Sequence, residues 1–131
     1  MTNTIEYVRE VARAVLHRLG DPAPRWEVLS VTPHHELHVT PAGLAAPNSV
    51  LVTIGDGGTT VQVYYSLDVP ADLATATTAG QIQDHAIEHT AGAALPPCPG
   101  HRHPLAARPL DGVASWTCPQ DPAHHTEPIV P

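Results

Sequence analysis

The stretch SVLVTIGDGGTTVQVYYSL, residues 49–67, alternates apolar and polar side chains on both sides of a glycine-rich centre. This period of two is typical of strands with one buried face. Gly and Asp tolerate the positive φ angles of a tight turn. The stretch therefore predicts a β-hairpin with strands over residues 49–54 and 59–67, and with one apolar row formed by Val50, Val52, Ile54, Val61, Val63, Tyr65 and Leu67.

Upstream of this hairpin, the period of the apolar residues changes once. From Thr4 to Leu19 they recur at steps of three and four, which predicts an amphipathic helix. Residues 26–32 and 36–40 alternate as strands do, with Pro33 and the adjacent histidines at the predicted turn between them. A loop rich in Pro, Gly and Ala then leads to the hairpin.

Downstream of the hairpin, residues 81–95 predict a second helix, and residues 68–80 are ambiguous, with a short helix from Ala71 as one interpretation. Short loops between consecutive strands favour antiparallel pairing. We therefore expect an α+β fold over residues 1–95: an antiparallel sheet of three or four strands, flanked by two helices on one face. Residues 96–131 form a separate, proline-rich tail.

Composition and charge restrict the class of protein. The chain has 131 residues, of which 42% are hydrophobic, so it can bury a core without disulfides. We find neither a signal peptide nor an apolar stretch of membrane-spanning length, and expect a cytoplasmic protein with reduced thiols. All six basic residues are Arg, which suggests a GC-rich genome, actinobacterial or phage.

The net charge of −7 argues against a nucleic-acid partner. Residues 1–97 carry four Arg against ten acidic residues, and residues 98–131 carry two Arg against three. The tail therefore lacks the basic surface that nucleic-acid binding requires.

The tail contains both cysteines and four of the ten histidines. Two Cys-Pro steps form tight turns that direct side chains toward one point, and thiolate and imidazole are the donors that zinc prefers. The predicted ligands are Cys98, His101, Cys118 and His124. His103 competes for the second position, and His125 and Asp121 for the fourth. Buried thiols without metal, or a disulfide, are the other interpretations.

This Cys-Pro-Gly-His and Cys-Pro spacing, with a β-hairpin between the two turns, resembles a zinc ribbon or the knuckles of the rubredoxin-like group. The resemblance covers residues 96–131 only, and the sequence departs from it at Asp121, where a ribbon has Cys or His. It implies one structural zinc ion per chain, because four protein ligands leave no open position.

A second motif, His85-Ala86-Ile87-Glu88-His89, has the form H-x-x-E-H. On a helix, two histidines four apart share a face, and the glutamate between them can activate a metal-bound water. This order resembles that of inverted zincins and implies a metal-dependent hydrolase as the alternative function. Those enzymes need a third ligand from a distant helix, where this chain offers only Glu6 and Glu10. Two solvated histidines are the simpler interpretation.

A third group, His34, His35 and His38, lies where the sheet is predicted to have an edge. Such a group can bind metal or respond to pH near the reference pKa of about 6.5. Polar side chains that protect an edge strand are the simpler interpretation.

The remaining sequence has no phosphate-binding loop, nucleophile elbow or dinucleotide fingerprint. We therefore expect a small, non-enzymatic protein-binding or adaptor protein with a protein or peptide partner. The order of helix, sheet and helix resembles secretion-chaperone-like domains, which bind segments on an open face or add a strand at an edge.

Overall fold

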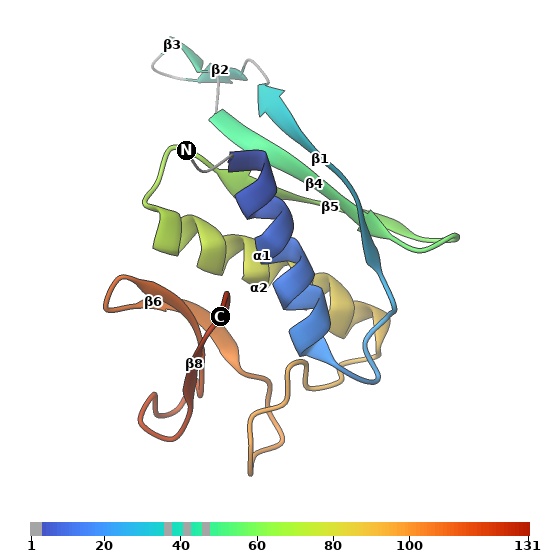
Figure 1. The fold of residues 1–131 in the computed structure, drawn as a ribbon, viewed down its shortest axis with the longest axis vertical. Coiled ribbons are helices and arrows are strands. Elements are labelled where there is room, and N and C mark those ends of the chain that lie inside the picture. The colour runs from blue at the N-terminus through green and yellow to red at the C-terminus, as the bar shows by residue number, and fades with distance from the viewer. Residues whose placement is uncertain (1–3, 36–37, 41–42, 46–47) are drawn as a thin grey trace.

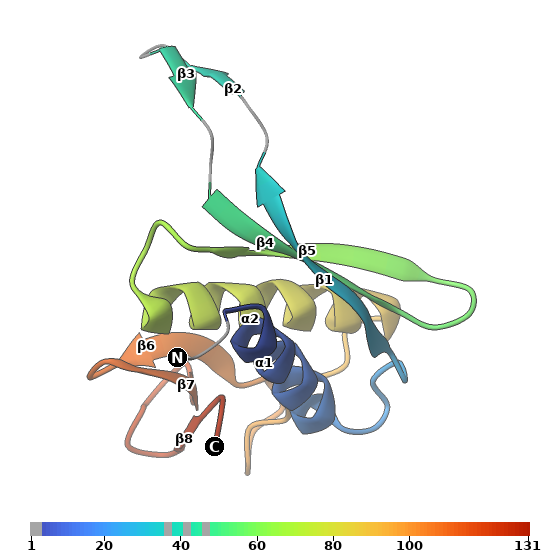
Figure 2. The ribbon, with the colours of Figure 1, turned by 45° about the horizontal axis from the view of Figure 1, so that its top comes forward.

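The fold places two helices between two antiparallel sheets (Figures 1 and 2). The computed structural model describes residues 4–35, 38–40, 43–45 and 48–131. The first sheet has the strand order β1-β4-β5, with β1 at Glu27–His35, β4 at Asn48–Gly55 and β5 at Thr60–Ser66. Helices α1 (Thr4–Leu19) and α2 (Ala71–His89) cover one face of it. The predicted α+β class is confirmed.

The second sheet packs against α2 on the side away from the first (Figure 2). Its order is β6-β7-β8, with β6 at Ala106–Leu110, β7 at Val113–Thr117 and β8 at Thr126–Pro128. A two-stranded hairpin, β2 (His38–Thr40) and β3 (Gly43–Ala45), extends beyond the ends of β1 and β4. Of the strand predicted at 36–40, residues 36 and 37 lie outside the described residues.

The predicted β4–β5 hairpin is confirmed in its register. Val52 pairs with Val63, and the predicted apolar row is buried except for Leu67, which lies beyond the end of β5 and is 38% exposed. The Asp56 carboxylate closes the turn by accepting hydrogen bonds from the N–H groups of Gly58 and Thr59, both at 2.8 Å. Short-range turn chemistry and the burial pattern therefore specify the same register.

The prediction of a turn at Pro33 was wrong. Strand β1 continues through this residue, pairing Pro33 with Val50 and His34 with Ser49. Because β1 is an edge strand, one side of it makes no ladder hydrogen bonds, and a residue without an N–H group is tolerated there. His34 and His35, which follow Pro33, are therefore the last two residues of β1.

The second helix begins ten residues before the predicted start of residue 81 and ends at His89, before the predicted end at Leu95. Helix α2 contacts α1, β5, β6 and β7, so it is covered on several sides. Apart from Ile82, its buried residues are small or polar, and they lie around much of the helix: Ala74, Thr75, Ala76, Thr78, Ala79, Gln83 and Ala86. A helix buried on several sides has no single apolar stripe, which is why its first half was ambiguous.

One hydrophobic core runs through all layers. Trp116, Leu105 and Ile129 of the C-terminal part belong to the same buried cluster as the residues of α1, α2 and the first sheet. Arg18 of α1 also donates to both carboxylate oxygens of Glu127 in β8, with the shortest N–O distance 2.7 Å. No helix in the described part of the chain has the length and apolar character needed to cross a membrane.

Candidate metal centre

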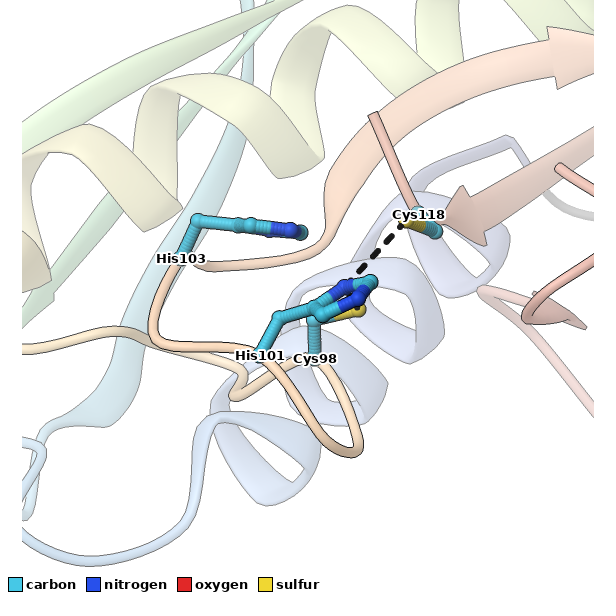
Figure 3. A group of neighbouring side chains, drawn as sticks. All are labelled: Cys98, His101, His103 and Cys118. Atoms are coloured by element: carbon cyan, nitrogen blue, oxygen red, sulfur yellow. Dashed lines mark hydrogen bonds between the residues drawn. The ribbon is translucent and has the colours of Figure 1, made fainter. Parts of the chain in front are cut away.

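Two loops bring the cysteines together below the C-terminal end of α2 (Figure 3). Cys98 lies in the first loop, where the His101 N–H donates to the Cys98 carbonyl at 3.1 Å and Gly100 has a φ of +78°. Glycine adopts such a φ without strain, so this Cys-Pro-Gly-His turn folds tightly and returns the His101 side chain toward the sulfur. Cys118 directly follows β7, and both cysteines are buried.

The group consists of Cys98, His101, His103 and Cys118, whose ligand atoms all lie within 4.8 Å of one another. His101 Nδ1 is 3.5 Å from Cys98 Sγ and 3.7 Å from Cys118 Sγ. Around a tetrahedral zinc ion with Zn–S and Zn–N distances of about 2.3 and 2.0 Å, a sulfur and a nitrogen are about 3.5 Å apart. The group could therefore hold a metal ion, and the distances of His101 match those of zinc ligands.

His103 gives the most direct indication of a missing partner. Its Nδ1 is 3.1 Å from the Pro104 carbonyl oxygen, which can only accept, so Nδ1 carries the proton and Nε2 has a free lone pair. That Nε2 atom is buried and has no hydrogen-bond partner, one of three such side-chain atoms among the described residues. An unpartnered buried acceptor costs about 1–3 kcal/mol. A metal ion would remove this cost, and a carbonyl on the other ring nitrogen is the usual arrangement for a ligating histidine.

His124, predicted as the fourth ligand, lies outside this group of four, and His103 lies in it. His124 Nε2 is 2.6 Å from the Pro99 carbonyl oxygen, and its ring stacks on the exposed His101 ring at a centroid distance of 4.5 Å. His124 therefore covers one ligand and secures the turn that carries it. The signal for His103 was present in the sequence, since it was the competing candidate, but spacing did not separate the two.

The other two candidates for the fourth position have different roles in the structure. His125 Nε2 is 2.9 Å from a carboxylate oxygen of Glu127. Asp121 closes the turn after Cys118, where its carboxylate accepts from the Ala123 N–H at 2.9 Å. Both side chains thus hold the loop between β7 and β8.

The two thiols differ in acidity. Burial raises the pKa of Cys98, and the neighbouring Cys118 raises it further. Burial also opposes ionisation of Cys118, but hydrogen bonds from the backbone N–H groups of Asp121 and Gln120 and from the Cys98 thiol outweigh it and lower its pKa. Cys118 is therefore the more acidic thiol of the pair, and backbone N–H groups directed at its sulfur favour the thiolate form that a metal needs.

The His101 pKa is lowered, first by desolvation and then by the charges of the nearby His124 and His103. The neutral imidazole is the form that binds metal. Crowding of three imidazoles beside two thiols thus favours the protonation state that a ligand needs.

A buried amide that the sequence analysis missed connects this site to α2. Gln83 Nε2 donates to the carbonyl oxygens of Leu95 and Leu105, at 2.9 and 2.6 Å. These carbonyls lie at the two ends of the loop that carries Cys98, His101 and His103. Helix α2 contains many other polar residues, so the sequence offered no signal that separates Gln83 from them.

The H-x-x-E-H segment lies at the C-terminal end of α2, where Glu88 and His89 are exposed and the His89 ring contacts the Trp26 ring edge-on at 5.0 Å. Among the described residues, the Cys98 group is the only set of three or more potential ligands close enough to share a metal. Within the described part of the chain, no third potential ligand lies close enough to share a metal with this segment.

Of the third histidine group, only His34 has a described side chain, and its ring contacts that of Tyr64 at 5.2 Å. The side chains of His35 and His38 lie outside the described residues. No protein-family model, curated protein or solved structure matches this chain.

Proposed function

We propose that this chain is a non-enzymatic binding protein whose C-terminal sheet is held in place by one structural zinc ion. The ligands would be Cys98, His101, His103 and Cys118. The observation that carries the proposal is His103 Nε2, a buried acceptor without a partner in the same group as two buried thiols.

The donor set favours zinc over the other common metals. Two thiolates and two imidazoles suit a borderline-soft ion that prefers a tetrahedron, whereas magnesium and calcium prefer oxygen. A reducing compartment such as the cytoplasm would keep both thiols available. Four protein ligands leave no position for water or substrate, which supports a structural role.

The position of the site explains what such an ion would stabilise. The two cysteines come from the loop before β6 and from the end of β7, which pair at the same end of the sheet, so one ion would fasten that end of the small second sheet. That sheet has short strands and few large apolar side chains, and metal binding compensates for a small core. The metal would then stabilise the fold without changing the shape of the surface that a protein or peptide partner binds.

Metal content measured by elemental mass spectrometry tests the proposal. We expect about one zinc ion per chain after dialysis against a mild chelator. Cys98→Ala and His103→Gln should lose it, whereas His85→Ala and His124→Gln should keep it. Zinc lost in His124→Gln but kept in His103→Gln would restore the set predicted from spacing. Wild-type protein without zinc would contradict the proposal altogether.

Because a ligand variant can also lose zinc by unfolding, each variant should be refolded with cobalt(II) and examined by absorption and circular dichroism. Thiolate-to-cobalt bands identify sulfur ligands independently of the amount of metal retained. A folded His103→Gln protein with unchanged cobalt bands would show that His103 is no ligand.

A further inference from the structure

A groove of about 540 Å³ opens at the other end of the molecule, between the start of α2 and the first sheet. Its volume lies within the range of about 300–1,000 Å³ that is usual for ligand pockets. Three large apolar side chains at the groove remain well exposed: Tyr64 at 43%, Leu73 at 42% and Val69 at 39%. Hydroxyl, amide and imidazole groups complete the lining, contributed by His34, Asn48, Ser49, Ser66, Thr77 and Gln81.

Strand addition is not available beside this groove. The edge of β5 is covered by α2: the Tyr64 N–H donates to Gln81 Oε1 at 3.0 Å, and Thr78 Oγ1 donates to the Tyr64 carbonyl at 2.9 Å. The opposite edge, β1, contains Pro33, which has no N–H group to offer. An occupant beside the covered edge of β5 must therefore be recognised through side-chain contacts, not through pairing with that strand.

One acidic residue lies at the rim of the groove, and two more lie about two turns farther along α2. Asp68 lies at its rim, where the carboxylate accepts from the N–H of the lining residue Asn48 at 2.9 Å. Thr77 and Gln81 of α2 line the groove. Asp84 and Glu88 are exposed and lie on the same face of the helix, each seven residues after one of these two. None of the described lining residues is an arginine, and the chain has no lysine.

We propose that this groove binds a basic, amphipathic segment of a protein partner. Apolar side chains of the segment would cover Tyr64, Leu73 and Val69, and its Arg or Lys residues would lie beside Asp68 and the acidic face of α2. Tyr64 can also accept a cation on its ring. The proposal rests on the binding half of the proposed function and is independent of the zinc site at the opposite end of α2.

The probe is a fluorescein-labelled synthetic peptide in which leucine and arginine alternate, titrated with the full zinc-loaded chain and followed by fluorescence anisotropy. Matched peptides carry glutamine or glutamate in place of arginine. We expect the arginine peptide to bind at least about tenfold more tightly than the glutamine peptide, with binding that weakens as salt rises. Equal binding of the arginine and glutamine peptides would overturn the charge recognition.

Two matched pairs of variants locate the binding surface. Leu73→Ser should weaken binding about tenfold, as expected for the loss of a buried leucine contact, whereas Leu29→Ser, at a similarly exposed leucine on β1, should not. The double change Asp84→Asn and Glu88→Gln should weaken it several-fold, but Glu6→Gln with Glu10→Gln on α1 should not. Identical effects within either pair would overturn the placement.

Zinc content, measured on the same samples, separates the two proposals. A Leu73→Ser protein that retains its zinc and loses the peptide supports the groove, and peptide binding without any bound zinc would contradict only the metal site. Self-association that depends on concentration in sedimentation and disappears in Leu73→Ser would overturn the peptide in favour of a second copy of the chain.

Discussion

The two larger sheets of this protein each have three strands, but they contribute differently to the core. The first sheet buries a row of Val, Ile and Tyr side chains against both helices. The second contributes mainly Leu105, Trp116 and Ile129 to the core and has shorter strands. Beside the second sheet lie an ion pair, a buried amide and the Cys98 group, which could hold a metal ion. The difference shows how polar and metal-binding groups can supplement a small apolar face.

Metal removal should have the largest effect on stability, and it should affect the second sheet more than the first. We expect a strong chelator to lower the midpoint of thermal unfolding by roughly 10 °C or more. Trp116 is fully buried in β7, and Trp26 precedes β1, so Trp26→Phe and Trp116→Phe each leave one reporter. Chelation should shift the fluorescence of Trp116 far more than that of Trp26. Equal shifts would show that both sheets depend on the metal.

A cavity in the first sheet should act independently of metal. Ile54 is fully buried in β4, and Ile54→Ala should cost about 2–5 kcal/mol of unfolding free energy in urea. We expect the same loss for zinc-loaded and chelated protein, because this side chain lies in the part of the core that the ion does not support. A loss that depends on zinc would show that the stabilities of the two regions are coupled.

The buried amide allows a finer test of the connection between α2 and the second sheet. Gln83→Leu leaves the carbonyls of Leu95 and Leu105 without donors, and we expect a loss of about 1–3 kcal/mol together with weaker zinc binding. Urea denaturation and a competition titration with a zinc indicator measure the two effects. Gln62→Leu, at an exposed position of β5, serves as the control and should change stability by less than about 0.5 kcal/mol.

The ion pair between Arg18 and Glu127 should have the smallest effect. Both side chains are partly exposed, so Arg18→Gln should cost about 0.2–1 kcal/mol. The hydrogen bond from Arg18 is the largest of the causes that lower the pKa of Glu127 in the folded state. The hydrogen bond from His125 also lowers this pKa, and burial opposes both. The pair therefore stabilises the fold above the unfolded pKa of the carboxyl and loses this contribution as the pH falls through the folded value. Glu127→Gln should remove that part of the acid dependence in urea titrations at several pH values.

The sequence was most informative where one side of an element faces the core. Helix α1 and the β4–β5 hairpin have a single apolar face, and their predicted positions agree with the structure to within a residue or two. Helix α2 contacts neighbours on several sides, so periodicity alone did not locate its start at Ala71. Pro33 was predicted as a turn residue because its tolerance in a strand depends on being at an edge, which only the assembled sheet reveals.

The candidate site divides in the same way. Local turn chemistry indicated Cys98, His101 and Cys118, which the structure places in one group. The choice between His103 and His124 depends on how the loop is held by Gln83, which lies 22 residues before Leu105, and on which ring nitrogen of His103 faces the Pro104 carbonyl. Spacing cannot report such contacts, because it carries no information about which ring nitrogen is buried.

The small side chains of α2 have a consequence for how this protein can vary over evolutionary time. Ala74, Ala79 and Ala86 are almost fully buried in a helix that has a sheet on either side. A larger residue at one of these positions would need space from layers that are already in contact, and overpacking costs about 1–3 kcal/mol. Compensation would then require a simultaneous change in a neighbouring layer. We therefore expect side-chain size along α2 to be inherited with little variation, while the solvent-facing residues of β1 change freely.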